Sequence, residues 1–211
     1  MKKFFKNYIN NNIKLEMYQK IGILFLVFVI AGIFGWIYEY IFYFLNSGMK
    51  VFYWRGGNFL PWINIYATGA LMIIFLTRKL KKHPFLIFLV AVIATGILEY
   101  FSGLVIYKFY DGLRLWDYNT EILSFGNIGG FVCLRSVLFF GFSALILMYL
   151  IVPFCIYLSK VMNKKLFITI TVLLFSIFLF DELYNLLFAR WYHLPRASSV
   201  YKKIGFKYMK Y

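Results

Sequence analysis

Residues 21–45 read IGILFLVFVIAGIFGWIYEYIFYFL, an apolar run that contains one charged residue, Glu39. A helix of about 20 such residues crosses the hydrocarbon core of a bilayer. The whole chain has the same character, since 63% of its 211 residues are hydrophobic, whereas soluble domains average roughly 45–50%. The sequence therefore predicts an all-α fold, a polytopic transmembrane helix bundle.

Further apolar stretches follow the first, separated by basic or polar segments. The five predicted spans are 21–45, 59–77, 84–109, 128–158 and 166–188. They form a transmembrane bundle over 21–188, flanked by a basic cytoplasmic segment at 1–20 and a basic, aromatic tail at 189–211. The fourth span exceeds the length that a bilayer requires, and its glycine-rich start favours a broken or re-entrant segment near 126–136.

Basic residues gather at one end of the predicted spans. Twelve Lys and Arg residues lie in 1–20, 78–83 and 159–165, against four in or beside the 46–58 and 110–127 loops. Because cytoplasmic loops carry the excess of Lys and Arg, we expect a multi-pass protein of the plasma membrane with a cytoplasmic N-terminus. Five crossings place the basic tail outside, as an exception to that rule. The net charge of +15 follows from these flanking bases, so the lipid bilayer is the expected partner and nucleic acid is not.

Half of the eight acidic residues lie inside apolar stretches. They are Glu39, Glu99, Asp181 and Glu182. A charge at the centre of a bilayer costs at least roughly 2.5–3.5 kcal/mol, so an ionisable residue there is a candidate functional site. We expect the neighbouring pair Asp181 and Glu182 to lie at the membrane interface, in the outward half of the last span.

Glu99 has the clearest local setting. Small or hydroxyl-bearing residues share its helix face: Thr95, Gly96, Ser102 and Gly103. Such a face lets a second helix approach closely and supplies hydrogen bonds, so Glu99 should point into the bundle. Its role is then either to bind a proton or cation, or to form a structural ion pair.

Arg135 is the one base that lies well inside an apolar stretch. Removing one member of a buried ion pair costs about 3–5 kcal/mol, so we expect Arg135 to pair with a buried acid, Glu99 or Glu39. Glu39 lies towards the outer end of its span. A side chain that reaches out to the interface is the alternative there.

Two outer segments are rich in aromatic residues. One, 54–66, contains Arg55 and Tyr66, and the other contains Trp116, Asp117 and Tyr118. Tryptophan and tyrosine are typical of membrane interfaces, yet charges between them would also suit the vestibule of a substrate pathway. The candidate pathway residues are therefore Glu39, Glu99, Arg135, Arg55, Asp117, Trp116, Tyr118 and Tyr66.

Catalytic and metal-binding patterns are missing from the sequence. There is no phosphate-binding G-x-x-x-x-G-K-[ST] loop, no G-x-S-x-G elbow and no His inside a predicted span. Cys133 and Cys155 are 22 residues apart on one stretch, which is about 33 Å along a helix and beyond disulfide reach. We expect no enzymatic activity, no catalytic residue, no metal and no cofactor.

Five short motifs occur in order between about residues 21 and 155. They are Gly35, Trp36 and Glu39; Arg55, Gly56, Pro61, Ile65 and Tyr66; Leu98, Glu99 and Tyr100; Trp116, Asp117 and Tyr118; and Asn127, Gly130, Cys133 and Leu134. In this order the chain resembles the bacterial ABC-transporter type IV permease family. It departs from the family pattern at Phe131, where the family has arginine, with Arg135 one turn later, and at Asn119, where the family has serine.

The resemblance implies a permease, the membrane-embedded transport subunit of an ABC-type system, with a separate ATPase subunit or further copies of itself as partners. Glu39, Glu99 and Arg135 would form its buried carboxylate–arginine centre. The inner loops at 78–83 and 159–165 are short for docking an ATPase. The alternative is a non-transporting scaffold or assembly factor, in which the same charges fix helix packing. An intramembrane enzyme is the least supported reading.

Overall fold

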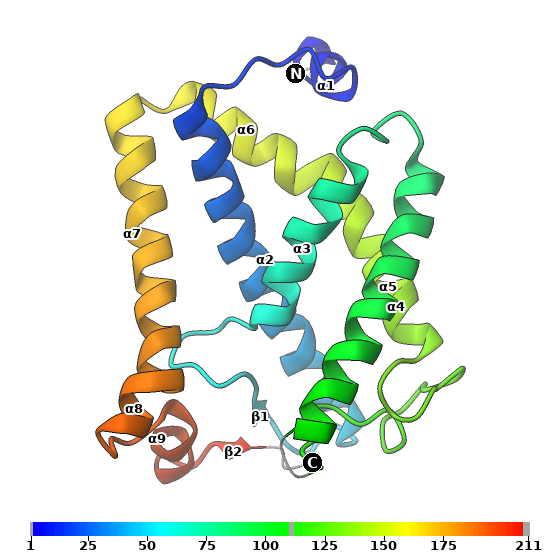
Figure 1. Ribbon diagram of the computed structural model, residues 1–211, viewed down its shortest axis with the longest axis vertical. Helices are drawn as coiled ribbons and strands as arrows, with labels where there is room; N and C mark the ends of the chain where they lie inside the picture. Colours follow the sequence, from blue (N-terminus) through cyan, green and yellow to red (C-terminus); the bar gives the residue numbers. More distant parts are fainter. Residues whose placement is uncertain (1, 110–111, 209–211) are drawn as a thin grey trace. The chain divides into compact units, whose positions relative to one another are not determined.

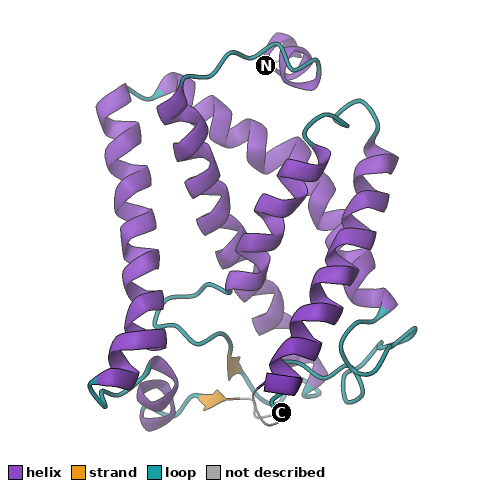
Figure 2. Ribbon diagram, in the orientation of Figure 1, coloured by secondary structure: helices purple, strands orange, loops and turns teal. Residues whose placement is uncertain are grey.

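The computed structural model describes residues 2–109 and 112–208; Asp111 of the predicted outer loop and Lys210 of the predicted tail lie outside the described residues. The described chain is almost entirely helical (Figure 2). Four of its helices are long and apolar enough to cross a membrane: Met17–Asn46, Pro84–Phe109, Leu134–Val161 and Lys164–Trp191. A shorter apolar helix covers Asn64–Thr77. The predicted all-α bundle of about five apolar helices is confirmed.

The described elements follow in chain order, and Figure 1 labels the α-helices and the two strands. They are α1 (Lys2–Ile9), α2 (Met17–Asn46), β1 (Tyr53–Trp54), α3 (Asn64–Thr77), α4 (Pro84–Phe109), α5 (Leu134–Ile146), the π-helix η1 (Leu147–Ile151), α6 (Val152–Val161), α7 (Lys164–Leu183), the π-helix η2 (Tyr184–Phe188), α8 (Ala189–Trp191), α9 (Ala197–Lys203) and β2 (Lys207–Tyr208). The third long helix is thus α5, η1 and α6 in succession. The fourth is α7, η2 and α8.

The chain divides into two compact units, which we describe separately. Of the described residues, 2–14 and 72–153 form one, which contains α4 and α5 and is called here the α4–α5 unit. Residues 15–71 and 154–208 form the other, which contains α2 and α7 and is called the α2–α7 unit. Each unit therefore combines segments from distant parts of the sequence.

Helix α4 carries two stripes, each with a spacing of four residues. The buried stripe is Ile87, Ala91, Thr95, Glu99 and Gly103. The exposed stripe is Phe85, Leu89, Ile93, Ile97, Phe101, Val105 and Phe109. Small residues bring α5 close, since a Cβ added at Gly141 would lie 2.6 Å from the Phe88 ring. An apolar stripe exposed along a long helix is what lipid contact requires, whereas the buried stripe holds the one acid of α4.

In the α2–α7 unit, the two long helices pack through glycine and aromatic residues. A Cβ added at Gly22 would lie 2.5 Å from Phe167, so only glycine allows this approach without a shift. Further along, Val29, Trp62 and Phe178 form a buried apolar core. Trp62 comes from the loop before α3, since residues 59–63 are not helical and α3 begins at Asn64 and not at the predicted residue 59.

The glycine-rich start of the fourth predicted span is not helical. Residues 126–133 form a compact turn closed by a bridge between Ile128 and Val132, and α5 begins at Leu134. Gly126, Gly129 and Gly130 have positive φ angles of 65°, 63° and 81°. Side-chain-bearing residues rarely adopt that conformation, and this is the physical reason that the helix starts six residues after residue 128.

The short helix α1 is attached to the rest of its unit by a hydrogen bond to a backbone carbonyl of the π-helix η1. In η1 the Val152 N–H bonds to the Leu147 carbonyl, one residue further back than in an α-helix. The next residue, Pro153, has no N–H to donate. The Met148 carbonyl accepts instead from the buried hydroxyl of Tyr8 on α1, at 2.6 Å.

Candidate functional site

Glu99 lies on the buried stripe of α4 and is 5% exposed. Its Oε1 accepts from the Tyr118 hydroxyl at 2.6 Å, and its Oε2 accepts from the Ser136 hydroxyl at 2.7 Å. Ser136 is in the first turn of α5, and Tyr118 is in the 112–133 loop. The prediction that Glu99 faces the bundle interior is confirmed, and two neutral hydroxyl groups bind its carboxylate.

Tyr118 is a buried residue of this site, and its hydroxyl group is a hydrogen-bond donor. The residue is 7% exposed, and its backbone N–H bonds to the Gly130 carbonyl at 3.1 Å. Burial, together with the Glu99 carboxylate, raises the pKa of the Tyr118 hydroxyl well above its usual value. The hydroxyl therefore keeps its proton at ordinary pH, and the loop contributes a permanent donor to Glu99.

Arg135 forms its ion pair with Glu121, with Nη2 and Oε2 2.7 Å apart. The sequence predicted Glu99 or Glu39 as its partner, and the structure gives this role to an acid that sequence reasoning missed. The reason is the 112–133 loop, which folds back over the start of α5 and brings Glu121 against the second residue of that helix. The Glu121 side chain is 1% exposed, so the carboxylate of this pair is shielded from water. The Arg135 guanidinium also lies 5.3 Å from the Tyr118 ring centroid.

Glu39 has its own arginine in the α2–α7 unit. Arg55 Nε lies 2.7 Å from Glu39 Oε2, and the Tyr66 hydroxyl donates to Oε1 at 3.2 Å. Arg55 is 9% exposed and stacks over the Tyr43 ring, 4.1 Å from its centroid. Three predicted site residues, Glu39, Arg55 and Tyr66, are thus brought together. An ion pair with Arg55 and a hydrogen bond from Tyr66 therefore satisfy the Glu39 carboxylate.

The two glutamate clusters are built in the same way. In each, a glutamate on a long helix binds one side chain of the following loop and one side chain of the next helix. The loop supplies Arg55 to Glu39 and Tyr118 to Glu99. The sequence also has a glycine followed shortly by Glu-Tyr at both places, GWIYEY at 35–40 and GILEY at 96–100, so a weak sequence repeat coincides with the repeated local structure.

Asp181 and Glu182 hold the loop that precedes α3. Asp181 accepts the backbone N–H groups of Phe59 and Leu60 at 2.9 and 2.8 Å, and Glu182 accepts from the Asn58 side-chain amide. The two acids are 5% and 8% exposed. The two acids are thus buried against residues 58–60, and their expected position at the membrane interface stays a prediction. Backbone N–H donors are invisible to sequence patterns, which is why this role was not predicted.

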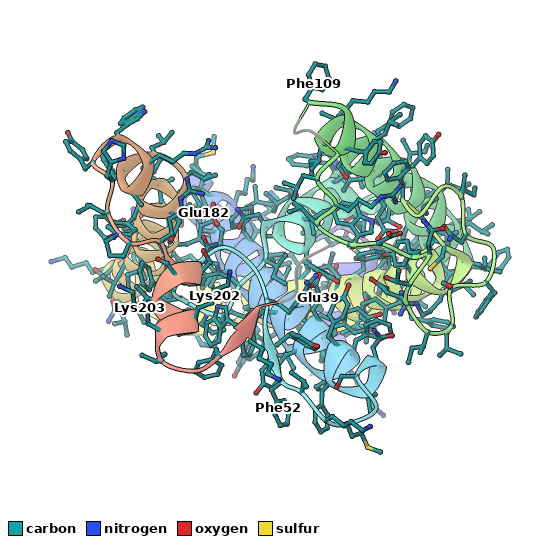
Figure 3. The ribbon with its side chains drawn as sticks, turned by 90° about the horizontal axis from the view of Figure 1, so that it is seen from below. Glu39, Phe52, Phe109, Glu182, Lys202 and Lys203 are labelled. Atoms are coloured by element: carbon teal, nitrogen blue, oxygen red, sulfur yellow. The ribbon has the colours of Figure 1, made fainter. Side chains whose placement is uncertain are left out.

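The C-terminal tail covers the same loop. Strand β2 pairs in parallel with β1, so that Tyr53 is opposite Lys207. The Tyr201 hydroxyl donates to the Phe59 carbonyl at 2.6 Å, and its ring stacks on Trp54 with centroids 3.9 Å apart. Figure 3 labels Lys202 and Lys203 on this tail helix, α9, and Glu182 on α7 of the same unit. The tail is thus an ordered part of the α2–α7 unit.

Trp116 and Asp117 stabilise the 112–133 loop from within. The Trp116 indole donates to the Phe131 carbonyl at 2.9 Å. Asp117 forms an ion pair with Arg114 at 3.3 Å and accepts from the Asn119 backbone at 3.0 Å. These contacts hold the loop that presents Tyr118 and Glu121. Among residues 2–109 and 112–208, no group of three or more His, Cys, Asp or Glu side chains is placed to hold a metal ion.

Comparison with known proteins places these clusters in a family. A family model described as "Putative ABC-transporter type IV" matches residues 26–186. The match includes both glutamate clusters and both acids of α7, and the tail after residue 186 lies beyond it. Neither the curated proteins nor the solved structures give a match. The chain belongs to the "Putative ABC-transporter type IV" family and is a multi-pass membrane protein of transporter type.

Proposed function

We propose that the chain is the permease subunit of a transport system and that Glu99 is its proton- or cation-binding group. The observation that supports this most directly is the setting of Glu99. It is a buried carboxylate on a membrane-spanning helix, bonded to two neutral hydroxyl groups and not to a cation. A charge in such a place is costly, and a proton or a small cation neutralises it. Reversible neutralisation is the chemistry of a coupling site.

The cluster of Glu39, Arg55 and Tyr66 is the second polar centre of the proposal. Here the carboxylate already has a cationic partner at 2.7 Å. Breaking that pair would leave both charges without a partner. This centre therefore suits the binding of a charged substrate group that replaces either Glu39 or Arg55 in the pair. Trp116, Asp117 and Tyr118 would line the approach to Glu99, on a loop that we expect outside the cell from the distribution of basic residues.

The proposal includes a plasma-membrane location with a cytoplasmic N-terminus. A separate ATPase subunit or further copies of this chain would complete the system. The family description supports a transporter component in preference to an enzyme.

A structural role is the second candidate, and one observation favours it. Each acid of these clusters ties a loop to a helix: Glu39 to Arg55, Glu99 to Tyr118, Glu121 to Arg135, Asp181 to Phe59 and Glu182 to Asn58. A scaffold or assembly factor needs no more than this. The two functions differ in what happens to Glu99, because only transport requires it to bind and release a proton or cation.

The test uses the full chain reconstituted in liposomes. Infrared difference spectra across a pH titration should contain the C=O band of a protonated carboxyl group that disappears in Glu99→Gln. Liposomes carrying an internal pH dye should acidify under an imposed membrane potential, and Glu99→Gln should abolish that flux. Glu16→Gln is the matched control, because it makes the same chemical change at an exposed glutamate.

The outcomes separate the two candidates. A titrating band and a proton flux that both depend on Glu99 support transport. A Glu99→Gln protein that is folded, with spectra and flux unchanged from wild type, rejects the coupling site. A Glu99-dependent band without any flux leaves the carboxyl group as a structural one.

A further inference from the structure

A basic hollow lies at the end of the α4–α5 unit where α1 meets the loop before α4. Its volume is about 490 Å³, and Lys6, Asn10, Lys81, Lys82, Pro84 and Tyr149 are among the residues that line it. It is remote in sequence from the glutamate clusters, and the proposed transport function does not use it.

Lys81 is the central charge of this hollow. Its Nζ bonds to the Asn11 side-chain oxygen at 2.8 Å and lies 3.9 Å from the Tyr8 ring centroid. Burial lowers the Lys81 pKa to about 8. Within the described residues, no carboxylate pairs with Lys6, Lys81 or Lys82. The ammonium group is therefore partly desolvated and stabilised only by neutral oxygens and a ring, which leaves its positive charge uncompensated.

The hollow is held in shape by two tyrosines. The Tyr8 hydroxyl fixes α1 to the Met148 carbonyl, and the Tyr149 hydroxyl donates to the Lys81 carbonyl at 2.8 Å. Two hydroxyl–carbonyl hydrogen bonds thus hold together the two segments that carry the three lysines. Such a site is formed before any ligand arrives, which reduces the entropy lost on binding.

The surroundings of the hollow decide which anion it fits. On α1, Phe5 is 42% exposed, and on α4, directly after Pro84, Phe85 is 69% exposed. A short helix with lysines on one face and an exposed aromatic side chain on another is typical of a helix that lies in the membrane interface. Apolar surface for acyl chains therefore adjoins the cationic space.

We propose that this hollow binds the phosphate headgroup of an anionic phospholipid, with Lys6, Lys81 and Lys82 around the phosphate and the acyl chains along the start of α4. A free phosphate ion would use the lysines and leave the apolar rim without a role. Each lysine near an anionic lipid surface contributes about a five-fold gain in affinity.

The experiment measures lipid binding to the full chain in neutral detergent by native mass spectrometry. The probes are phosphatidylglycerol, phosphatidylcholine of the same acyl chains, and inorganic phosphate as competitor. We expect retention of phosphatidylglycerol over phosphatidylcholine, and a loss of about 25-fold in that preference when Lys6→Gln and Lys82→Gln are combined. Lys79→Gln is the matched control, because Lys79 is an exposed base of the same loop that does not line the hollow.

Each outcome decides the proposal. A preference that is lost in the double glutamine variant, retained in Lys79→Gln and retained in the charge-preserving Lys6→Arg/Lys82→Arg protein supports it. Equal retention of the two lipids overturns it. An equal loss in Lys79→Gln reduces the effect to diffuse surface charge. Displacement of the lipid by inorganic phosphate at matched concentration assigns the hollow to a free anion.

Discussion

Tyr66 and Ser136 occupy equivalent places in the two units: each is the third residue of its helix, and each donates its hydroxyl to a glutamate on the preceding long helix. The glutamates are Glu39 and Glu99. They differ in their second partner, which is charged for Glu39 and neutral for Glu99. This difference makes the two hydroxyl groups unequal in energetic importance.

Removal of the Ser136 hydroxyl should destabilise the fold more than removal of the Tyr66 hydroxyl. Ser136→Ala leaves one Glu99 oxygen buried without a donor, which costs about 1–3 kcal/mol. Tyr66→Phe leaves Glu39 with its arginine and should cost about 0.5–1.5 kcal/mol. Denaturant unfolding in one detergent measures both. Ser143→Ala, at a half-buried serine of the same helix, is the control and should be near neutral.

Arg135 should couple to Glu121 more strongly than to Glu99. Arg135→Gln leaves the buried Glu121 carboxylate without its cationic partner and should lower the free energy of unfolding by about 3–5 kcal/mol. Combining it with Glu121→Gln should recover most of that loss, because both charges are then gone. A double-mutant cycle on unfolding free energies measures the coupling. A larger coupling with Glu99→Gln than with Glu121→Gln would contradict the observed ion pair.

Asp181→Asn should loosen residues 58–60 without unfolding α7. The carboxylate accepts two backbone N–H groups on its two oxygens, and an asparagine side chain has one acceptor oxygen. Hydrogen exchange of the Phe59 and Leu60 amides should become faster, with the α7 amides unchanged. Glu16→Gln serves as the control, and protection of the two amides equal to wild type would remove Asp181 from this role.

The tail and the first loop should be accessible from the same side of the membrane. The pairing of β1 with β2 and the Tyr201 contact to Phe59 require this. Single cysteines at Lys50 and Lys203, both exposed, should react with an impermeant maleimide added outside intact cells, and a cysteine at Lys79 should not. The buried Cys133 and Cys155 should contribute little background. Labelling of the first two sites from opposite sides would mean that the strand pair does not form in the membrane.

The helical content and the inward face of Glu99 could be predicted because both follow from periodicity. Thr95 and Gly103 lie one turn on either side of Glu99, and small residues at that spacing indicate a packed face whatever packs there. The aromatic loop motifs also singled out Tyr118 and Arg55 as candidate site residues, although the sequence did not say which glutamate each one binds. These signals involve residues that are close together in the chain, so a single sequence is enough to reveal them.

The partners of Arg135 and Asp181 could not be predicted, because both depend on loop conformation. Glu121 lies in a polar segment without periodicity, and it reaches Arg135 only after the chain turns at Gly126, Gly129 and Gly130. The partners of Asp181 are backbone N–H groups, which every residue except proline possesses. Ser136 was overlooked beside Arg135 in the sequence, although a hydroxyl residue in the first turn of a helix was the available signal.

Pro153 affects the hydrogen bond between the Tyr8 hydroxyl and the Met148 carbonyl, although it takes no part in that bond. The acceptor of the Tyr8 hydroxyl is the carbonyl of residue 148, a backbone atom that no side-chain substitution at Met148 removes. A residue with an N–H group at position 153 could donate to that carbonyl in the same i→i−5 pattern as Val152 to Leu147, and would then compete with the Tyr8 hydroxyl. In a pairwise mutational scan, the epistatic partner of Tyr8 should therefore be Pro153, five positions beyond the residue it touches. A covariation signal between positions 8 and 153 would identify the attachment of α1 in other family members, even where residue 148 varies freely.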